Sequence, residues 1–477
     1  MAFEIPDGLM VSVSGVRGRV GEALTPEVVA RFAAAFGAYV GEGVRGRRPR
    51  VVLGRDSRTS GPMFARVATA ALQSVGCDVI DVGVAPTPTT LFAIRHHGAD
   101  GAIVVTASHN PVEWNALKFA SAAGMFLDSE EGPRMRAYVT DRPVPYAAWD
   151  GLGEVSQDPD AAARHVEAVL RIPYLDVEAL RRRRFKVALD CIRGAGSKVL
   201  PRLLEALGCE VVGLNMEADG RFPREPEPIA QNLGDLERLV RESGADLGLA
   251  TDPDADRLSL VAGSGRAIGE DFTLALAAEL VLRHRPGPVV TNLSTSRVVE
   301  DVAAAAGVPF YRTAVGEINV ARRMEAEGAV IGGEGNGGVI LPDVHLTRDA
   351  VVAAALVLQL LVETGRTLDE HVAAHREYVI IKDKLPRDAG RLEDAYATLL
   401  DRLSAPEVDR QDGLRLSWPA EAKWLHLRPS GTEPILRIMA EAPTEAEARE
   451  LVSRARAALV PSGSRPAVSM GAQEHTT

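Results

Sequence analysis

Short apolar runs that end in a polar turn recur along the chain and alternate with amphipathic stretches. Residues 51–53 and 102–105 are two such runs, which favour buried strands. Between them, apolar positions at helical spacing predict a helix that begins near Pro62 and stops at Gly76. Residues 77–82 then return as a strand, and a strand, helix, strand unit of this kind builds parallel sheets.

The passage from a helix through a glycine to an extended run occurs three times. Residues 72–80 are echoed by residues 204–212, and a looser copy occupies residues 303–310. In each copy a glycine stands where the helix stops, which is typical of the left-handed cap position. The repetition predicts three related α/β domains.

The C-terminal part follows another pattern. Residues 414–418, 424–427 and 435–440 predict strands, and Thr444 with Glu447 predicts a capping box that opens a helix. A chain of 477 residues is too long for one hydrophobic core. We therefore expect three related mixed-sheet α/β domains, a smaller C-terminal α+β domain and a disordered tail, at residues 1–145, 146–264, 265–373, 374–460 and 461–477.

Composition and charge exclude several classes of protein. Hydrophobic residues make up 46% of the chain and the net charge is −11, whereas a nucleic-acid-binding surface needs clustered Lys and Arg. The sequence contains neither an apolar run of membrane-spanning length nor an apolar N-terminal signal. Its three cysteines have no C-x-x-C spacing and suit a reducing compartment. We expect a cytoplasmic protein that binds neither nucleic acid nor membrane.

A hydroxyl group follows one of the predicted buried strands. Ser108 lies in the turn at residues 106–111, the serine loop, directly after the run 102–105. Loops at the carboxyl ends of such strands are where open α/β sheets bind ligands. Taken alone, the turn is better explained by backbone geometry, and Ser108 becomes a candidate nucleophile only beside the loops that follow.

Three carboxylates follow another apolar run, at residues 247–250. Asp252, Asp254 and Asp256 alternate along the acidic loop, residues 252–257, so on extended backbone they can converge on one hard cation. A solvated acidic turn is the alternative, but carboxylates packed together repel unless a cation neutralises them. A ligand set made only of oxygen favours Mg²⁺.

Two further loops carry groups suited to a sugar phosphate. The glycine-rich loop, residues 332–338, holds Glu334 and Asn336, which can hydrogen-bond to sugar hydroxyls, although a flexible hairpin explains it equally well. The phosphate loop, residues 428–434, combines Arg428 with two hydroxyls and a glycine N–H, a set that grips a phosphate dianion; a plain polar turn is equally consistent. Neither a P-loop nor a dinucleotide fingerprint is present, and no Gly-x-Ser-x-Gly elbow occurs at the serine.

In their order and separations these four loops resemble the α-D-phosphohexomutase superfamily, which includes phosphoglucomutases, phosphomannomutases and phosphoglucosamine mutases. The resemblance spans nearly the whole chain and implies one loop per domain around a central cleft. It implies that Ser108 is the phosphoserine and that it binds Mg²⁺ together with Asp252, Asp254 and Asp256. It assigns Glu334 and Asn336 to the sugar, and Arg428, Ser430, Gly431 and Thr432 to a phosphate. The groups that it places around the reacting phosphate are Arg17, Arg58, His109, Lys118 and Arg257.

The activity implied by the resemblance is an interconversion of hexose 6-phosphate and hexose 1-phosphate by an intramolecular phosphotransferase. Phosphorylated Ser108 would exchange phosphate with the sugar through a bisphosphorylated intermediate, with hexose 1,6-bisphosphate as primer. Lys118 or His109 would carry the proton of the sugar hydroxyl. We expect a small-molecule sugar phosphate as the partner, and a monomer or homodimer.

The substrate is less closely defined. Residues 12–21, 113–119 and 430–434 most resemble the archaeal-type phosphoglucosamine mutase branch, which favours conversion of glucosamine 6-phosphate to glucosamine 1-phosphate. The glycine-rich loop departs from the commoner family form, which has serine in place of Asn336, so phosphomannomutase and phosphoglucomutase activities are alternatives. A non-catalytic sugar-phosphate-binding protein and a metal-dependent phosphatase are alternatives of other classes. The first need not keep the nucleophile and metal ligands, and the second has no need of a distal phosphate clamp.

Overall fold

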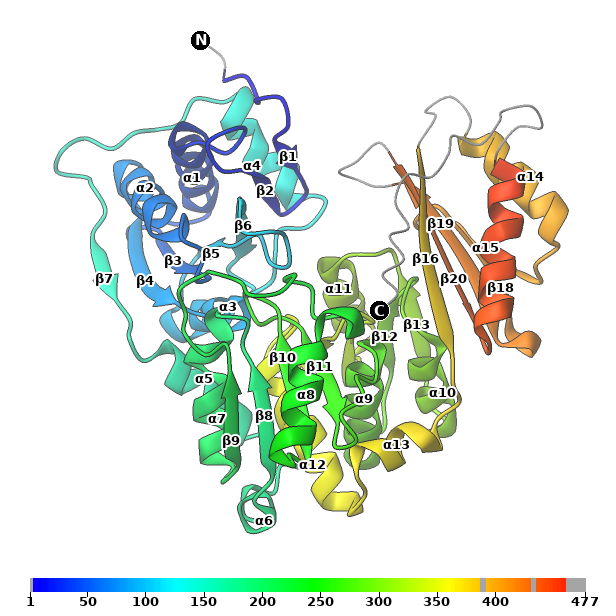
Figure 1. Ribbon diagram of the computed structural model, residues 1–477. Helices are drawn as coiled ribbons and strands as arrows, with labels where there is room; N and C mark the ends of the chain where they lie inside the picture. Colours follow the sequence, from blue (N-terminus) through cyan, green and yellow to red (C-terminus); the bar gives the residue numbers. More distant parts are fainter. Residues whose placement is uncertain (1–2, 387–391, 430–434, 460–477) are drawn as a thin grey trace. The chain divides into compact units, whose positions relative to one another are not determined.

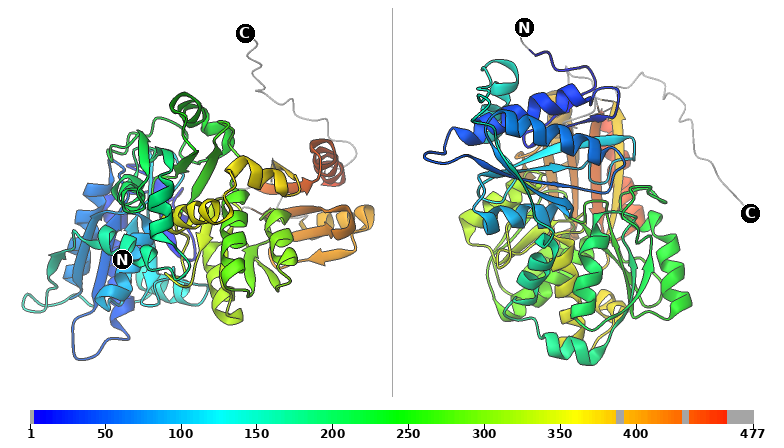
Figure 2. Two further views of the ribbon diagram at one scale, coloured as in Figure 1. Left: turned by 90° about the horizontal axis from the view of Figure 1, so that it is seen from below. Right: turned by 90° about the vertical axis from the view of Figure 1, so that its left-hand side faces the viewer.

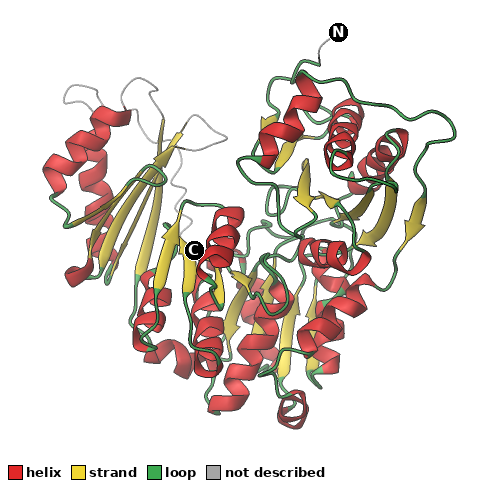
Figure 3. Ribbon diagram, turned by 180° about the vertical axis from the view of Figure 1, so that it is seen from behind, coloured by secondary structure: helices red, strands yellow, loops and turns green. Residues whose placement is uncertain are grey.

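The computed structural model describes residues 3–386, 392–429 and 435–459, and the chain forms two compact units, Met1–Arg376 and Glu377–Thr477 (Figure 1). The first unit contains three sheets and the second contains one. Helices lie on both sides of the strands in the first unit and on one side of the C-terminal sheet (Figure 3). The expected multi-domain α/β fold with a smaller α+β part at its C-terminus is confirmed.

The first sheet has seven strands in the order β1-β2-β6-β5-β3-β4-β7. Its strands are β1 (Met10–Val11), β2 (Gly15–Arg19), β3 (Arg50–Arg55), β4 (Asp78–Val84), β5 (Gly101–Val105), β6 (Trp114–Ser121) and β7 (Val155–Gln157). The helices of this part are α1 (Pro26–Gly41), α2 (Gly61–Ser74), α3 (Thr87–His97) and α4 (Glu131–Thr140).

Residues of β3 alternate between two hydrophobic cores. Val51 and Leu53 pack in the core that includes α1 and α2, which lie side by side (Figure 2), whereas Val52 packs in the core that includes α3. A strand covered on both faces needs apolar residues at every position, which is why a continuous apolar run predicts it.

The second and third sheets have four strands each, in the orders β11-β10-β8-β9 and β13-β12-β14-β15. The second comprises β8 (Lys186–Asp190), β9 (Glu210–Leu214), β10 (Leu247–Thr251) and β11 (Leu258–Ala262), with α5 (Ala161–Leu170), α6 (Val177–Arg183), α7 (Leu200–Ala206), α8 (Gly234–Ser243) and the 3-10 helices η1 (Ala195–Lys198) and η2 (Ala230–Asn232). The third comprises β12 (Val289–Asn292), β13 (Phe310–Thr313), β14 (Ile331–Glu334) and β15 (Gly338–Ile340), with α9 (Asp271–His284), α10 (Arg297–Ala305), α11 (Glu317–Glu327), α12 (Ala350–Thr364) and α13 (Leu368–Ala374).

The three sheets of the first unit share one core topology. When four strands of each sheet are numbered in chain order, starting at β3, β8 and β12, their order across the sheet is 4-3-1-2. The fourth strand is antiparallel to the third, and the other pairs are parallel. Gly76, Gly208 and Gly307 follow α2, α7 and α10 with φ of +79°, +73° and +68°, just ahead of the second strand in each sheet. The predicted repeat of helix, glycine and strand is therefore a repeat of the fold.

The second unit is a five-stranded antiparallel sheet in the order β16-β20-β19-β18-β17. Its elements are β16 (Val379–Pro386), α14 (Leu392–Leu403), β17 (Glu407–Asp409), β18 (Leu414–Trp418), η3 (Pro419–Glu421), β19 (Lys423–Pro429), β20 (Ile435–Ala442) and α15 (Glu445–Leu459). Thr444 Oγ1 accepts a hydrogen bond from the Glu447 N–H just before α15, as the capping pattern predicts.

Within the residues that the structure describes, no single helix is long and apolar enough to cross a membrane. By length and composition α12 and α13 pass the test only together, as a pair bent by 85°.

Candidate active site

The three candidate loops of the first unit occupy the same place in their sheets. The serine loop leads from β5 towards β6, the acidic loop joins β10 to β11, and the glycine-rich loop spans the turn from β14 to β15. Each connection therefore runs from the third strand of the repeat to the antiparallel fourth. Hydrogen bonds bring the loops together: Ser108 Oγ donates to Asp252 Oδ2 over 2.8 Å, and the N–H of Leu258, directly after the acidic loop, donates to Gly337 O over 2.9 Å.

Ser108 is held in an uncommon backbone conformation. Its φ is +48°, and its N–H donates to Thr106 Oγ1 over 2.9 Å. Positive φ in a residue with a Cβ costs on the order of 1–3 kcal/mol, so it persists only where the surroundings fix it. The side chain is 6% exposed, so the hydroxyl is buried against the acidic loop.

Arg58 fixes that conformation through hydrogen bonds to the backbone of the loop. The side chain is fully buried, with its Nε 3.0 Å from Asp56 Oδ2. Its two terminal nitrogens donate over 2.6–3.0 Å to four backbone carbonyls, those of Ser108, Asn110, Pro111 and Trp114. Every nitrogen of the guanidinium is thus engaged within the protein, and Arg58 supports the backbone of the serine loop. The structure thus gives Arg58 a positioning role, and its predicted place around the reacting phosphate stays a prediction.

The carboxylates of the acidic loop are fully buried and converge. Asp252, Asp254 and Asp256 each offer an oxygen, and these oxygens lie within 4.8 Å of one another. Burial, with the charges of its two neighbours, raises the pKa of Asp252 well above its usual range. Burial acts in the same sense on Asp254, but the Lys118 ammonium and a network of hydrogen bonds hold the pKa of that carboxyl below its usual range.

Two oxygens of this group lack hydrogen-bond partners among the described residues. They are Oδ1 of Asp254 and Oδ1 of Asp256, both buried. Their sister oxygens are occupied, since Asp254 Oδ2 accepts from Thr87 Oγ1 over 2.7 Å and from Lys118 Nζ over 2.9 Å. Buried carboxylate oxygens without a donor are costly, and an all-oxygen set suits a hard divalent cation. The residues present therefore fit a magnesium ion.

Basic side chains predicted from the sequence surround the acidic loop and the serine loop. Lys118 pairs with Asp254; burial lowers its pKa, but Asp254 and Asp256 outweigh burial and raise it. The charge of Arg257, together with burial, lowers the pKa of His109 well below its usual range, so its imidazole is neutral. Arg17 donates to Asn110 Oδ1 over 2.5 Å.

The glycine-rich loop is a tight hairpin in which Glu334 is buried. At Gly333 the φ is +151°, and a Cβ would lie 2.0 Å from Gly338 O, so only glycine fits there. Glu334 Oε1 accepts from Asn292 Nδ2 over 2.7 Å, and Asn336 Nδ2 lies 3.4 Å from Glu334 Oε2. Asn336 thus folds back on the glutamate that shares its loop.

Arg348 joins two of these loops and was missed by sequence reasoning. Its guanidinium donates to Asp256 and to Glu334, and its Nε lies 3.2 Å from Glu317 Oε2. Burial opposes its charge, yet these carboxylates raise the pKa of Arg348 well above the usual value. The loops contribute several carboxylates that need a neutralising cation. The number of those negative charges was the one signal in the sequence that a further arginine lies at the site.

The phosphate loop belongs to the second unit. Arg428 is the penultimate residue of β19, and its Nε lies 3.0 Å from Asp412 Oδ2. The other predicted phosphate contacts, Ser430, Gly431 and Thr432, lie outside the described residues.

Comparison with known proteins covers almost the whole chain. Residues 9–142, 163–265, 269–378 and 380–458 match families described as phosphoglucomutase/phosphomannomutase alpha/beta/alpha domains I, II and III and C-terminal domain. A probable phosphoglucosamine mutase of Methanopyrus kandleri is 39% identical over 452 residues, 93% of this chain and 96% of that protein. A phosphoglucomutase/phosphomannomutase of Thermococcus kodakarensis is 39% identical over 447 residues, with 93% and 96% covered. A crystal structure of a phosphoglucomutase/phosphomannomutase family protein from Burkholderia thailandensis superposes with a TM-score of 0.81 at 28% identity, covering 94% of this chain and 98% of that one.

These matches define a phosphohexomutase, an isomerase that transfers phosphate intramolecularly on a hexose. The chain belongs to the phosphoglucomutase/phosphomannomutase family of the α-D-phosphohexomutase superfamily, in its archaeal-type phosphoglucosamine mutase branch. The family and enzyme class expected from the four loops are confirmed.

Proposed function

We propose that the enzyme converts glucosamine 6-phosphate to glucosamine 1-phosphate, with Ser108 carrying the phosphate between turnovers. The observation that carries this proposal is the buried hydrogen bond from Ser108 Oγ to Asp252 Oδ2, 2.8 Å long, which joins a strained serine to three convergent carboxylates. A nucleophile held against a metal-binding group is what phosphoryl transfer requires.

Asp252, Asp254 and Asp256 hold Mg²⁺ in this proposal, with the phosphorylated Ser108 as a further ligand. A divalent cation bound there would neutralise charge on the transferring phosphoryl group. Arg257, the last residue of the acidic loop, adds positive charge next to the carboxylates, with its Nε 3.7 Å from Asp256 Oδ1. Arg17 supplies a second guanidinium at the serine loop.

Two groups can carry the proton of the sugar hydroxyl. His109 is neutral, because neighbouring guanidinium charge and burial lower its pKa, and its Nδ1 is buried without a partner among the described residues. A neutral imidazole can accept a proton, whereas Lys118 is charged and paired with Asp254. The two roles therefore divide: His109 accepts the proton, and Lys118 contributes charge.

Substrate recognition is assigned to two other loops. Glu334 and Asn336 bind sugar hydroxyls, and Arg428 with Ser430, Gly431 and Thr432 grips the phosphate that is not reacting. The bisphosphorylated sugar must turn over before it returns its other phosphate, so Arg428 has to exchange its contact with Asp412 for a ligand in each cycle. We also propose the four domains at residues 1–145, 146–264, 265–373 and 374–460, with a hexose 1,6-bisphosphate as primer.

The test is a side-by-side measurement of 1-to-6 phosphate migration and of free phosphate with glucosamine, glucose and mannose phosphates. We expect migration without release of phosphate, and the highest kcat/KM with the glucosamine phosphate. A higher kcat/KM with glucose or mannose phosphate would change the substrate assignment and leave the mutase assignment intact. Release of phosphate as the main product would indicate a phosphatase. Formation of neither product would indicate a non-catalytic binding protein.

A further inference from the structure

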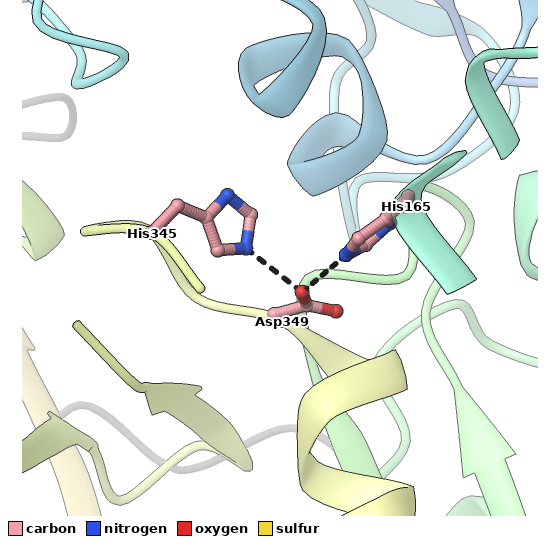
Figure 4. A group of neighbouring side chains, drawn as sticks. All are labelled: His165, His345 and Asp349. Carbon is pink, nitrogen blue, oxygen red and sulfur yellow. Dashed lines mark hydrogen bonds and ion pairs between the residues drawn. The ribbon is translucent and has the colours of Figure 1, made fainter. Parts of the chain in front are cut away.

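A second buried cluster has no part in the chemistry described above. It adjoins Ala350, whose N–H donates to Ala255 O of the acidic loop over 3.3 Å. It consists of His165 on α5, His345 in the segment before α12, and Asp349 at the N-terminus of α12 (Figure 4). Asp349 Oδ2 accepts from both imidazoles, 2.7 Å from His165 Nε2 and 2.8 Å from His345 Nε2. All three side chains are at most 2% exposed. We call these three residues the histidine–aspartate cluster.

The geometry of the cluster favours hydrogen bonding over metal binding. Each Nε2 points at the same carboxylate oxygen at hydrogen-bond distance, as the dashed lines in Figure 4 mark, so both ring N–H groups have an acceptor. His165 Nδ1 is 2.9 Å from Thr89 Oγ1, whose hydroxyl can donate to it. A closed structural zinc site takes four ligands, whereas this buried group offers three.

Both carboxylate oxygens of Asp349 accept hydrogen bonds. Its Oδ1 accepts from the N–H groups of Val351 and Val352, over 2.7 and 3.3 Å, and so caps α12. Its own N–H donates to Val339 O over 2.9 Å. The histidines thus fix the carboxylate that starts the helix, and Phe92 of α3 lies against both rings, with centroids 5.5 and 6.1 Å away.

The residue next to this anchored carboxylate is Arg348. Its N–H donates to Glu317 Oε1 over 3.0 Å, and its guanidinium donates to Asp256 Oδ2 and to Glu334 Oε2. By occupying Oδ2 of Asp256 it leaves Oδ1 as the free oxygen of that carboxylate. Groups that hydrogen-bond to metal ligands orient them and tune metal affinity.

We propose that the histidine–aspartate cluster positions Arg348, and that Arg348 in turn orients Asp256 for metal binding. The cluster therefore acts on the metal site through a chain of contacts that starts on α5 and ends in the acidic loop. This inference rests on the metal role assigned to the acidic loop under the proposed function.

The test measures Mn²⁺ affinity by electron paramagnetic resonance, which needs no turnover, together with the melting temperature. Arg348→Lys should raise the Mn²⁺ dissociation constant about 10-fold to 100-fold, as removal of a group that orients a ligand does. His165→Leu and His345→Leu should each raise it about 3-fold to 30-fold, the range of couplings that act at a distance. His345→Gln, which keeps a donor near the position of Nε2, should restore part of the affinity.

A matched control is His371 of α13, which contacts the other end of α12. His371 is 1% exposed and its Nε2 lies 2.8 Å from Thr364 Oγ1 near the end of α12, so His371→Leu also removes a buried imidazole. It should lower the melting temperature and leave Mn²⁺ affinity unchanged.

Three results would overturn the inference. Affinity in His165→Leu and His345→Leu that matches the His371→Leu control, at a similar loss of melting temperature, reduces the cluster to a structural role. One equivalent of a transition metal in the wild type, lost in His345→Leu by elemental analysis, makes it a metal site. A wild type that binds no Mn²⁺ refutes the proposed metal role as well, whereas binding that Asp254→Asn abolishes and the leucine variants preserve refutes this inference alone.

Discussion

Replacing Arg58 by lysine tests whether the hydrogen bonds of its guanidinium hold the serine loop in place. The guanidinium makes five hydrogen bonds, one to Asp56 and four to backbone carbonyls of the loop and of Trp114. A lysine ammonium has three donors, so Arg58→Lys keeps the charge beside Asp56 and loses at least two of these five hydrogen bonds. Each hydrogen bond from a charged donor contributes about 1.5–3 kcal/mol, which gives an expected loss of about 3 kcal/mol.

Amide hydrogen exchange in the loop measures this loss locally. The N–H groups of Asn110 and Trp114 donate to Ala107 O and Pro111 O, both over 3.1 Å, and report on loop opening. We expect Arg58→Lys to speed their exchange by about 10²-fold, since about 1.4 kcal/mol corresponds to a factor of ten. Arg47→Lys, in an exposed pair with Asp100, is the control and should change little. Equal rates in wild type and Arg58→Lys would refute the positioning role.

Three further predictions concern the phosphate loop, the metal and pH. Arg428→Ala should lower kcat/KM about 10-fold to 100-fold by loss of a charge-assisted bond to phosphate, and an unchanged kcat/KM would remove Arg428 from the clamp. Exhaustive chelation should abolish turnover and added Mg²⁺ should restore it; full activity after chelation would argue against a metal in the acidic loop. Burial lowers the pKa of His426 to about 4, against 6.5 for the free side chain, and its Nε2 is 2.7 Å from Asp412 O. The unfolded chain therefore takes up this proton first, so the second unit should lose up to about 3 kcal/mol as pH falls from 6.5 through 4, measured by hydrogen exchange in β19. His426→Gln should flatten that dependence, and an equally steep curve in the variant would contradict the assignment.

Much of the fold was predictable because its causes are local. Strands covered on both faces, such as β5 and β10, need apolar residues throughout, so they stand out as continuous runs. The glycines after α2, α7 and α10 adopt positive φ, which residue types other than glycine rarely do. They therefore mark the same step in each repeat.

The roles of two arginines were not predictable because they depend on packing between distant elements. The resemblance placed Arg58 at the site, but its support of the serine loop arises only when residues 106–114 fold over it. Arg348 meets Asp256, 92 positions away, through the packing of separate sheets. The four loops were recognisable as a set, but which groups face a ligand and which support the loops is decided by tertiary contacts.

The central claim is that Ser108 carries phosphate, and labelling tests it most directly. Incubation with a hexose 1,6-bisphosphate that bears radioactive phosphate, followed by peptide mapping, should place up to one equivalent of label on the peptide that contains Ser108. Ser108→Ala should incorporate none and should lack mutase activity. Label on another residue, or undiminished labelling of Ser108→Ala, would contradict the account.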